Sequence, residues 1–409
     1  MRKFLLLAFR NVFRNRRRTV MTLLVVSGGV AGLLLVGGFF SFMFRGLRES
    51  TIRNGLGHLQ IYSAEHFERD EVHVLDTGLD DYQRVAELAA RNQHVRGVTA
   101  RIEFYGMVSN GMKSAVFLGT GVDAGKEKSM GFQPTITAGH YLDTGGTEAN
   151  QALLGAGLAR SMGAKPGDSL TLLSVTSDGA LNGIDTDVTG IVTTGFKEMD
   201  DRLLTIPLAS AQRLLQSQRV TKLVVGLDKT ENTDQVYAAI IPRLAGARQQ
   251  YAIRKWIDLA SYYKQVHLMM SGIFVFLGVI VFFMVVMSSA NTLMMAMFER
   301  TREIGTMLAM GTPRAWLVGL FVAEAAFTGI LAGALGVAAG TGLGALLNHC
   351  GIVLPPPPGN TAGMALKVMH EPTLMVGAAV LALITLVLAS LMPAVRASRL
   401  RIVEALSHV

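Results

Sequence analysis

Four long apolar runs constrain the fold, because each exceeds the roughly 20 residues that cross a bilayer as an α-helix. Thr19–Phe44, Val266–Phe298 and Pro372–Val395 contain no charged residue. Ala315–Leu347 contains one acidic residue, Glu324. An ordinary soluble domain does not contain uncharged apolar runs of this length. They predict transmembrane helices at 19–44, 266–298, 315–347 and 372–395.

The basic residues gather beside these runs. Segments 1–18, 299–314 and 396–409 hold thirteen basic and three acidic residues, so together they carry more than the formal charge of +8 of the whole chain. Short basic segments beside spans stay in the cytoplasm. We therefore expect both termini and the 299–314 segment to be cytoplasmic, with residues 45–265 and the loop 348–371 outside. The basic charge then gives no support for nucleic-acid binding.

The first 18 residues have two faces at helical spacing. Phe4, Leu5, Ala8, Phe9, Val12 and Phe13 share one face, and Arg2, Lys3, Arg10 and Arg14 take the other. This pattern predicts an amphipathic helix lying in the membrane interface, or else a cytoplasmic extension of the first span. The first apolar run is far longer than that of a signal peptide, so we expect it to stay as an anchor.

Residues 45–265 are predicted to form a mixed α/β domain. Short β-rich runs bounded by Gly, Asp and Ser predict strands at Ser114–Leu118, Ser169–Leu173, Asp187–Val192 and Lys222–Gly226. Helical spacing predicts helices at Leu79–Leu88, Gln151–Met162 and Thr233–Leu244. We expect two subdomains, in which the first and last parts pair around a middle insertion. The fold class is therefore a membrane protein with four transmembrane α-helices and a large α/β extracytoplasmic, or periplasmic, domain inserted between helices 1 and 2.

This domain lacks the motifs of common enzymes. There is no phosphate-binding loop, because Gly125-Lys126 is followed by Glu127, and there is no G-x-S-x-G or H-E-x-x-H motif. The single cysteine, Cys350, excludes an intrachain disulfide and a cysteine metal cluster. We therefore expect no catalytic site and no metal site.

Two polar groups in the domain are interpreted as structural. His58, His66 and His73 are spread along a polar stretch and are expected to be surface residues. Asp178, Asp185 and Asp187 miss the spacing of an EF-hand and are expected in a turn-rich hairpin.

Small and polar residues within the spans indicate how the helices pack. Glycines four residues apart allow close approach of helices in lipid, although glycine is also common in such helices; they are Gly28, Gly32, Gly329, Gly333, Gly336, Gly340 and Gly344. An acid in a span costs on the order of 2.5–3.5 kcal/mol, so Glu324 should face protein or water. The partners expected for it are Ser288, Ser289, Asn291 or Thr292 in the second span.

Two further features leave alternatives open. The methionines of the second span, Met284, Met287, Met294 and Met295, are interpreted as ordinary apolar packing rather than a substrate track. Pro355–Pro358 is either a rigid spacer or a contact with a partner.

The segment 299–311 has the pattern of a short two-faced helix. Ile304, Met307, Leu308 and Gly311 fall on one stripe, and Glu299, Arg302 and Glu303 on another. From the pattern alone it either docks into the groove of a partner or lies on the lipid headgroups.

The same segment carries a family resemblance. The string E-R-T-R-E-I-G-x-x-x-A-M-G at Glu299–Gly311 resembles the signature of the FtsX-like permease family, which includes the transmembrane parts of the MacB exporter and of the Lol lipoprotein-releasing complex. Further matches in the same order are Ala8–Arg16, Gly119–Asp123, Leu154–Ala159, Lys165–Asp168, Gly190–Gly195, Pro207–Leu215, Pro393–Arg399 and Val403–Leu406. The resemblance covers nearly the whole chain.

The resemblance implies a permease subunit of an ABC transporter that is not itself an enzyme. Two permeases, as a homodimer or heterodimer, would bind two ATPase subunits, which would hold the ATP and Mg, so this chain itself would bind no cofactor. Because the sequence starts almost at the first span, the ATPase is expected on a separate subunit. The coupling segment that touches the ATPase would comprise Glu299, Arg300, Arg302, Glu303, Ile304, Gly305, Met307, Leu308 and Gly311.

The function that the resemblance implies is mechanotransmission from ATP hydrolysis to the outside domain. We expect a multi-pass protein of the inner membrane, in contact with membrane lipids, that releases a lipoprotein or exports another envelope substrate, with a lipoprotein or other periplasmic partner. The alternative is a regulatory complex like FtsX itself, which controls a cell-wall hydrolase without transport.

Overall fold

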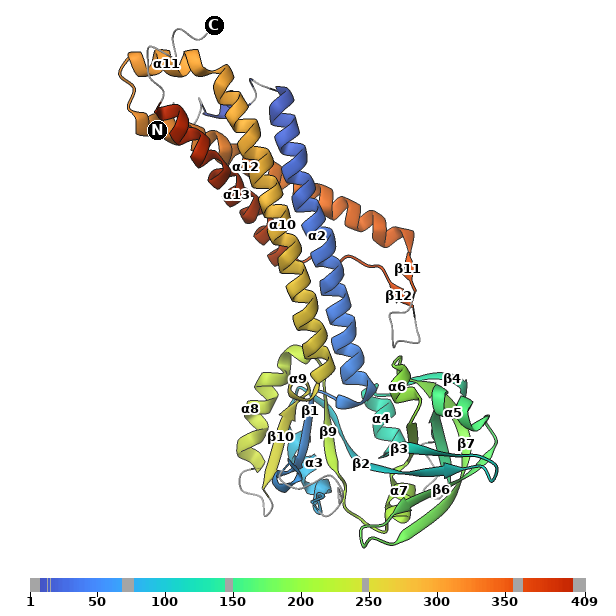
Figure 1. The fold of residues 1–409 in the computed structure, drawn as a ribbon. Coiled ribbons are helices and arrows are strands. Elements are labelled where there is room, and N and C mark those ends of the chain that lie inside the picture. Colours follow the sequence, from blue (N-terminus) through green and yellow to red (C-terminus); the bar gives the residue numbers. More distant parts are fainter. Residues whose placement is uncertain are drawn as a thin grey trace. The chain divides into compact units, whose positions relative to one another are not determined.

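The computed structural model describes residues 8–12, 14, 16–67, 77–143, 150–244, 250–355 and 363–399 (Figure 1). The chain forms two compact units. The helical unit comprises Met1–Arg45, Val266–Leu354 and Ala365–Val409, and the core unit comprises Gly46–Gln265 and Pro355–Met364. Predictions for residues 1–7, His73, Pro356–Pro358 and residues 400–409 fall outside the described residues.

The helical unit contains the four predicted spans. In the described part of the chain, four helices are long and apolar enough to cross a membrane. They are α2 (Arg16–Thr51), α10 (Ser261–Glu299), α12 (Arg314–Cys350) and α13 (Pro372–Ser398). A short helix, α11 (Thr301–Ala309), lies between α10 and α12, and β11 (Val353–Leu354) pairs with β12 (Met364–Ala365). The helices extend beyond the charge-free runs, so the membrane boundaries of the spans stay predictions.

The start of the chain shows the predicted distribution of polar and apolar residues only in part, because Phe9, predicted on the apolar face, is 49% exposed. Residues 8–12, 14 and 16 onward are helical. Ala8 and Val12 are buried, whereas Arg10 and Arg14 are exposed. Placement of this helix in the membrane interface stays a prediction.

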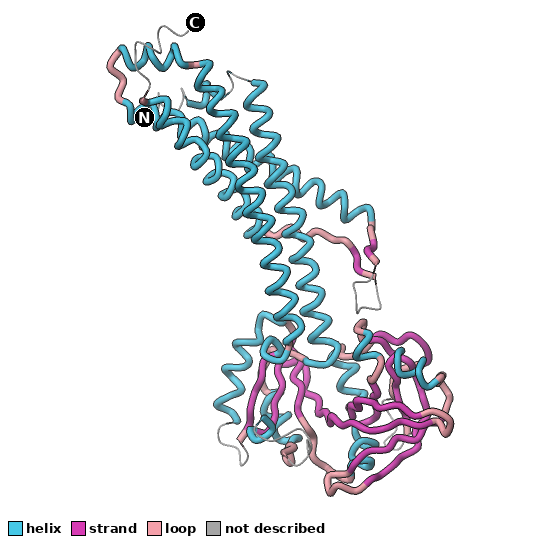
Figure 2. The backbone as a smooth tube through the Cα atoms, viewed as in Figure 1, coloured by secondary structure: helices cyan, strands magenta, loops and turns pink. Residues whose placement is uncertain are grey.

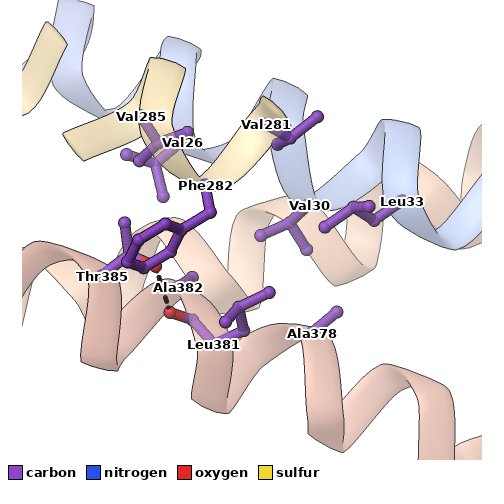
Figure 3. A pocket seen from close by; sticks show the side chains of 11 residues that line it. Val26, Val30, Leu33, Val281, Phe282, Val285, Ala378, Leu381, Ala382 and Thr385 are labelled. Atoms are coloured by element: carbon purple, nitrogen blue, oxygen red, sulfur yellow. Dashed lines mark hydrogen bonds between the residues drawn. The ribbon is translucent and has the colours of Figure 1, made fainter. Parts of the chain in front are cut away.

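The four long helices pack around a small apolar centre. Its buried residues are Val26, Val30, Leu34, Val285, Ala332, Ala378, Ala382 and Leu386. Between α2, α10 and α13 lies a void of about 20 Å³, in whose lining Thr385 donates its hydroxyl to the carbonyl of Leu381 at 2.7 Å (Figure 3). An apolar void of this size holds about one water-sized probe and is too small for a substrate.

The core unit is built on a mixed sheet of ten strands (Figure 2). In chain order the strands are β1 (Leu59–Ser63), β2 (Val95–Ser109), β3 (Ser114–Val122), β4 (Thr135–Gly139), β5 (Gln151–Gly155), β6 (Ser169–Val175), β7 (Leu181–Thr193), β8 (Leu203–Pro207), β9 (Lys222–Leu227) and β10 (Tyr251–Lys255). Their order in the sheet is β10-β1-β9-β2-β3-β8-β5-β7-β4, and β6 pairs with β2 and β7.

Short helices connect and cover these strands. They are α3 (Tyr82–Ala90), α4 (Ala124–Met130), α5 (Ala156–Met162), α6 (Lys197–Asp200), α7 (Leu208–Leu215), α8 (Thr233–Leu244) and α9 (Trp256–Leu259), with single turns η1 (Ile52–Leu56), η2 (Ala64–Phe67) and η4 (Thr230–Asn232). The main core lies between helices and sheet and includes Phe117, Leu154, Leu158, Leu172 and Val225. Leu158 belongs to α5, and the other four residues lie on strands.

Most secondary-structure predictions for this unit are confirmed, and one is wrong. All four predicted strands and the helix at Thr233–Leu244 are present. The predicted helix Gln151–Met162 is instead strand β5 followed by helix α5, because residues 151–155 pair with both β7 and β8. The first and last strands pair as expected, Leu59 to Ser63 against Lys255 to Tyr251. One sheet runs through both parts, so the division into subdomains stays a prediction.

Candidate functional site

The chain turns sharply between α10 and α12, and α11 forms the corner. Arg300, with φ −101° and ψ 12°, breaks the helix between α10 and α11. Gly311 ends the corner in the left-handed region, at φ +85°. The amides of Gly311 and Thr312 donate to the carbonyls of Leu308 and Met307, at 3.0 and 3.1 Å. Such a glycine-terminated turn satisfies the last carbonyls of a helix and fixes its end.

The apolar stripe of α11 faces its own helical unit. Ile304 is 1% exposed, and it packs with Met297 of α10, Leu317 of α12 and Ala397 of α13. Met307 and Leu308 lie partly buried against the same cluster, and Gly305 is buried. The sequence pattern identified this stripe, which packs on its own chain; docking of the segment on a partner stays a prediction. Burial of this face within the chain leaves only the opposite face of α11 for a partner.

The opposite face of α11, which we call the outer face, consists of Arg302, Thr306, Ala309 and Met310, all of them exposed. Met310 is 73% exposed. Thr306 lies four residues after Arg302, and Ala309 and Met310 lie three and four residues after Thr306, which places them on one side of a helix. Sequence reasoning included only Arg302, although the same spacing counted from Arg302 would have found the others. Gly311 is not on the helical stripe, because it follows the helix in the terminating turn.

Two ion pairs join the start of the chain to this corner. Arg14 pairs with Glu303 of α11, and Arg18 of α2 pairs with Glu299 at the end of α10. The Arg14–Glu303 pair is about half exposed. Exposed pairs contribute little stability, roughly 0–1 kcal/mol. Their consequence is positional, because they hold residues 14–18 against the corner.

Glu324 of α12 lies in a polar cluster with residues that the sequence did not indicate as partners. Asn11 donates its side-chain amide to Oε1 of Glu324 at 2.5 Å, and Arg300 approaches Oε2 with Nη1 at 3.3 Å. Nη2 of Arg300 also donates to the backbone carbonyl of Asn11 at 3.4 Å. The side chains of Arg300 and Glu324 are each 13% exposed. The cluster therefore connects the N-terminal segment, the corner and α12.

The predicted partners of Glu324 in α10 are wrong. Thr292 donates to the carbonyl of Ser288 in its own helix, at 2.9 Å. Ser289 is buried, and its hydroxyl has no hydrogen-bond partner among the described residues. The reason is the turn at Arg300, which brings a cation from just outside the predicted span back to the acid.

The glycines of α12 lie where helices approach closely. A Cβ on Gly329 or Gly333 would stand 3.0 or 3.3 Å from the backbone of α13, and one on Gly336 would stand 2.6 Å from Val30 of α2. Gly340 and Gly344 are similarly close to Leu34 and to His370. Larger residues at these positions would therefore force the helices apart.

The prediction for the glycines of the first span needs correction. A Cβ on Gly28 or Gly32 would meet no atom within 4 Å in the described residues. The close contacts of α2 are instead made by Gly29, Gly37 and Gly38, which face Val281, Leu374 and Met369. The rotation of the helix decides which of its glycines pack, and the sequence does not give that rotation.

The core unit provides no metal site among its described residues, where no three His, Cys, Asp or Glu side chains come together. His58 is buried rather than on the surface as expected. Its Nδ1 accepts from the amide of Leu227 at 3.1 Å, and burial lowers the pKa of His58, with Glu49 opposing the shift. Asp185 accepts from Thr171 at 2.7 Å within the β6–β7 hairpin, the arrangement expected for this acidic group.

This architecture defines a class of protein: a multi-pass membrane protein with a domain inserted between its first two spans. Residues 19–243 match the MacB-like periplasmic core domain, and residues 273–402 match the FtsX-like permease C-terminal domain. The first match alone covers more than half of the chain. The chain therefore belongs to the FtsX-like permeases with a MacB-like periplasmic core domain, and is an ABC transporter permease of that type.

The similarity to individual proteins is distant. The chain is 28% identical to the lipoprotein-releasing system transmembrane protein LolC of Neisseria meningitidis over 199 residues, which are 47% of each chain. It is 24% identical to LolE of Haemophilus influenzae over 304 residues, 71% of this chain and 68% of that protein. The chain thus spans about half the length of the first of these relatives.

Among solved structures, the periplasmic region of MacB from Actinobacillus actinomycetemcomitans is similar in fold. The match covers 52% of this chain and 95% of the MacB chain. The TM-score of that match is 0.37 and the sequence identity is 14%.

Proposed function

We propose that this chain is the permease subunit of an ABC complex that passes ATP-driven motion through the membrane to the core unit, and that the complex releases a lipoprotein or exports another envelope substrate. The observation that carries the proposal is the corner at α11, which has an exposed outer face and an inner face tied to three helices. The LolC and LolE relatives, each described as a transmembrane protein of a lipoprotein-releasing system, support the substrate class.

In this proposal the ATPase is a separate subunit that holds ATP and Mg, and it docks on the outer face of α11. The exposed outer face of α11 can bind the ATPase. Because the opposite face packs on α10, α12 and α13, a displacement of α11 would move all three helices. Glu299, Arg300 and Glu303 then keep the corner attached to the N-terminal segment and α12 through their ion pairs. Their role is positional rather than contact with the partner.

We expect the double substitution Arg302→Glu and Met310→Asp to lower recovery of the ATPase at least tenfold in a pull-down with the full-length chain. Loss of a hot-spot side chain at an interface costs about 2 kcal/mol or more, and we expect the outer face to contain one. The ATPase is the ATP-binding subunit that co-purifies with the unsubstituted chain, identified by mass spectrometry. A lipoprotein recovered with it supports release, whereas a cell-wall hydrolase supports the regulatory alternative.

Lys128→Glu, an exposed charge reversal on α4 of the core unit, is the matched control and should leave recovery unchanged. Equal recovery with the Arg302→Glu, Met310→Asp variant would show that the outer face is not the docking surface. Absence of any ATP-binding subunit from the unsubstituted preparation would contradict a separate ATPase.

The orientation that we propose places both termini and α11 in the cytoplasm and the core unit outside. In a Cys350→Ser background, a cysteine at Asp178, in the exposed β6–β7 turn, should react with an impermeant maleimide in intact spheroplasts. A cysteine at Ala309, on the outer face of α11, should react only after lysis. The opposite pattern would invert the topology.

We further propose that α10 faces a second permease or lipid. Its apolar residues Val275, Phe276 and Phe283 are more than half exposed in the described chain, as are Met284, Met287 and Met295. Met294 is half-buried, and the interpretation of the four methionines as ordinary apolar packing rather than a substrate track stays a prediction. An apolar helix surface of this kind is stable only against lipid or another apolar helix.

A further inference from the structure

The core unit contains a cavity of about 650 Å³. Its walls come from β2, β3, β8 and β9, from α4 and α6, and from two segments that join the core unit to the spans, Thr51–Leu56 and Ser261–Tyr263. Sites for small molecules commonly enclose about 300–1,000 Å³. The volume is therefore that of a ligand-binding site, far above the void in the helical unit.

Every basic side chain among the described residues of this cavity wall is already paired. Arg101 donates from Nε and Nη2 to the two oxygens of Glu127, at 2.8 and 2.7 Å, and from Nη1 to the carbonyl of Gly55. The side chains of Arg101 and Glu127 are 7% and 2% exposed. Lys222 pairs with Glu103 at 2.5 Å. With Glu198, the wall holds two cations and three carboxylates.

Burial disfavours the charged form of both cations, and the two paired carboxylates oppose that effect. Burial opposes the charged form of Arg101, yet the Glu127 carboxylate outweighs it and raises the pKa of Arg101. Burial lowers the pKa of Lys222, and Glu103 opposes this only in part. Cations held this way have their charge matched by a carboxylate, so they offer no free positive charge to an anionic ligand.

The rest of the wall is largely aromatic and apolar. Phe196 and Tyr262 meet edge to face with centroids 5.7 Å apart, and Phe132, Tyr141 and Tyr263 add further rings. Glu103, with 47% of its side chain accessible, provides polar atoms, as do the lining residues Thr120 and Thr205. A pocket of this kind combines apolar surface with a few polar groups that orient a ligand.

We propose that this cavity binds an amphipathic molecule whose polar end is uncharged or zwitterionic. The aromatic wall would receive the apolar body, and Glu103, Thr120 and Thr205 would receive the polar end. An anionic end would meet an excess carboxylate and no unpaired cation, which costs free energy at a partly buried site. The site goes beyond the proposed function and does not depend on it, because binding is measured without ATP or ATPase.

The chain offers an internal reporter for binding. Trp256 is nearly buried beside the cavity, where it contacts Tyr263 with ring centroids 5.1 Å apart and packs in one cluster with Phe132. Trp316 is the only other tryptophan. In a Trp316→Phe chain reconstituted in nanodiscs of phosphatidylglycerol, lysophosphatidylcholine with a brominated acyl chain should quench Trp256 fluorescence saturably. The unbrominated compound should reverse the quenching by competition.

Substitutions that fill the cavity with a larger side chain test whether the ligand binds there. Thr120 and Thr205 pair across β3 and β8, and either Thr120→Phe or Thr205→Phe should weaken the binding at least tenfold. Val116→Phe, at an exposed position of the same strand β3 outside the cavity wall, should leave binding unchanged. Lysophosphatidylglycerol with the same brominated chain should bind at least tenfold more weakly than the zwitterionic compound.

Three results would overturn the proposal. Quenching that does not saturate, or that the unbrominated compound does not reverse, would show simple partition into the bilayer. Equal binding in a folded filling variant would place the ligand elsewhere. Tighter binding of the anionic compound would refute the ligand class. The competition measurement needs no substitution in the cavity. It therefore tests saturable binding even if the Thr120→Phe and Thr205→Phe variants both unfold.

Discussion

Replacing Arg101 with methionine should lower the free energy of unfolding of the core unit by about 3–5 kcal/mol, because the Glu127 carboxylate then stays buried without its cation. Both side chains are almost fully buried, and the guanidinium also holds the carbonyl of Gly55. For a domain of this size, about 1 kcal/mol shifts the melting temperature by roughly 2–4 °C, so the shift should be about 10 °C. Thermal unfolding followed by Trp256 fluorescence in the Trp316→Phe chain measures it.

Two controls separate charge from packing. The double variant Arg101→Met, Glu127→Met removes both charges and should recover most of the loss, since replacing a whole buried pair with apolar residues is often neutral. Arg219→Met breaks an exposed pair with Asp80 and should change stability by no more than about 1 kcal/mol. If the free energy of unfolding of Arg101→Met lies within about 1 kcal/mol of the parent's, water reaches Glu127 and the Arg101–Glu127 pair is not buried.

The sequence predicts the spans because few backbone structures are stable in the hydrocarbon core of a membrane. An uncharged run long enough to cross must form a helix, since lipid cannot satisfy backbone polar groups. The strands at Lys222–Gly226 and Ser169–Leu173 were equally visible, because β-branched and leucine residues stand between clear turn residues. In these elements the local signal and the tertiary environment agree.

The segment 151–162 shows where local signal is insufficient. Ala152, Leu153 and Leu154 are apolar in succession, which fits a buried strand or a buried helix equally well. Pairing to β7 on one side and β8 on the other decides for a strand. Those partners lie at least 30 residues away along the chain, so no window around the segment contains the information.

The candidate site was predicted in part for a similar reason. The stripe of Ile304, Met307 and Leu308 was correctly read as one apolar face, but a sequence pattern does not say whether such a face packs on its own chain or on a partner. The partners of Glu324 were missed because Asn11 is 313 residues distant in sequence. Arg300 lay just outside the predicted span, so a search within the spans excluded it.

Glu324→Leu should have the largest effect of any substitution in the helical unit. Leucine removes the carboxylate that Arg300 and Asn11 face, and it leaves a guanidinium that is only 13% exposed without an anion. Breaking such a pair costs about 3–5 kcal/mol. Glu324→Gln keeps the shape and its amide oxygen can still accept from Arg300 and Asn11, so it should cost less than Glu324→Leu, although Arg300 lacks its anion in both variants. The exposed Glu303 offers a matched control, because Glu303→Leu breaks only the pair with Arg14.

The proposed function makes this cluster the connection between the corner at α11 and α12, so the decisive readout is the response of the core unit to ATP. In the Trp316→Phe chain assembled with its ATPase, trapping with ATP and vanadate should change Trp256 fluorescence. Glu324→Gln and Glu303→Leu should keep most of that change, whereas Glu324→Leu should reduce it at least fivefold, although ATP hydrolysis measured without vanadate continues. The double variant Glu324→Leu, Arg300→Leu should regain stability, because no charge stays unpaired, but not the fluorescence response. A normal response in Glu324→Leu would show that motion reaches the core unit by another route.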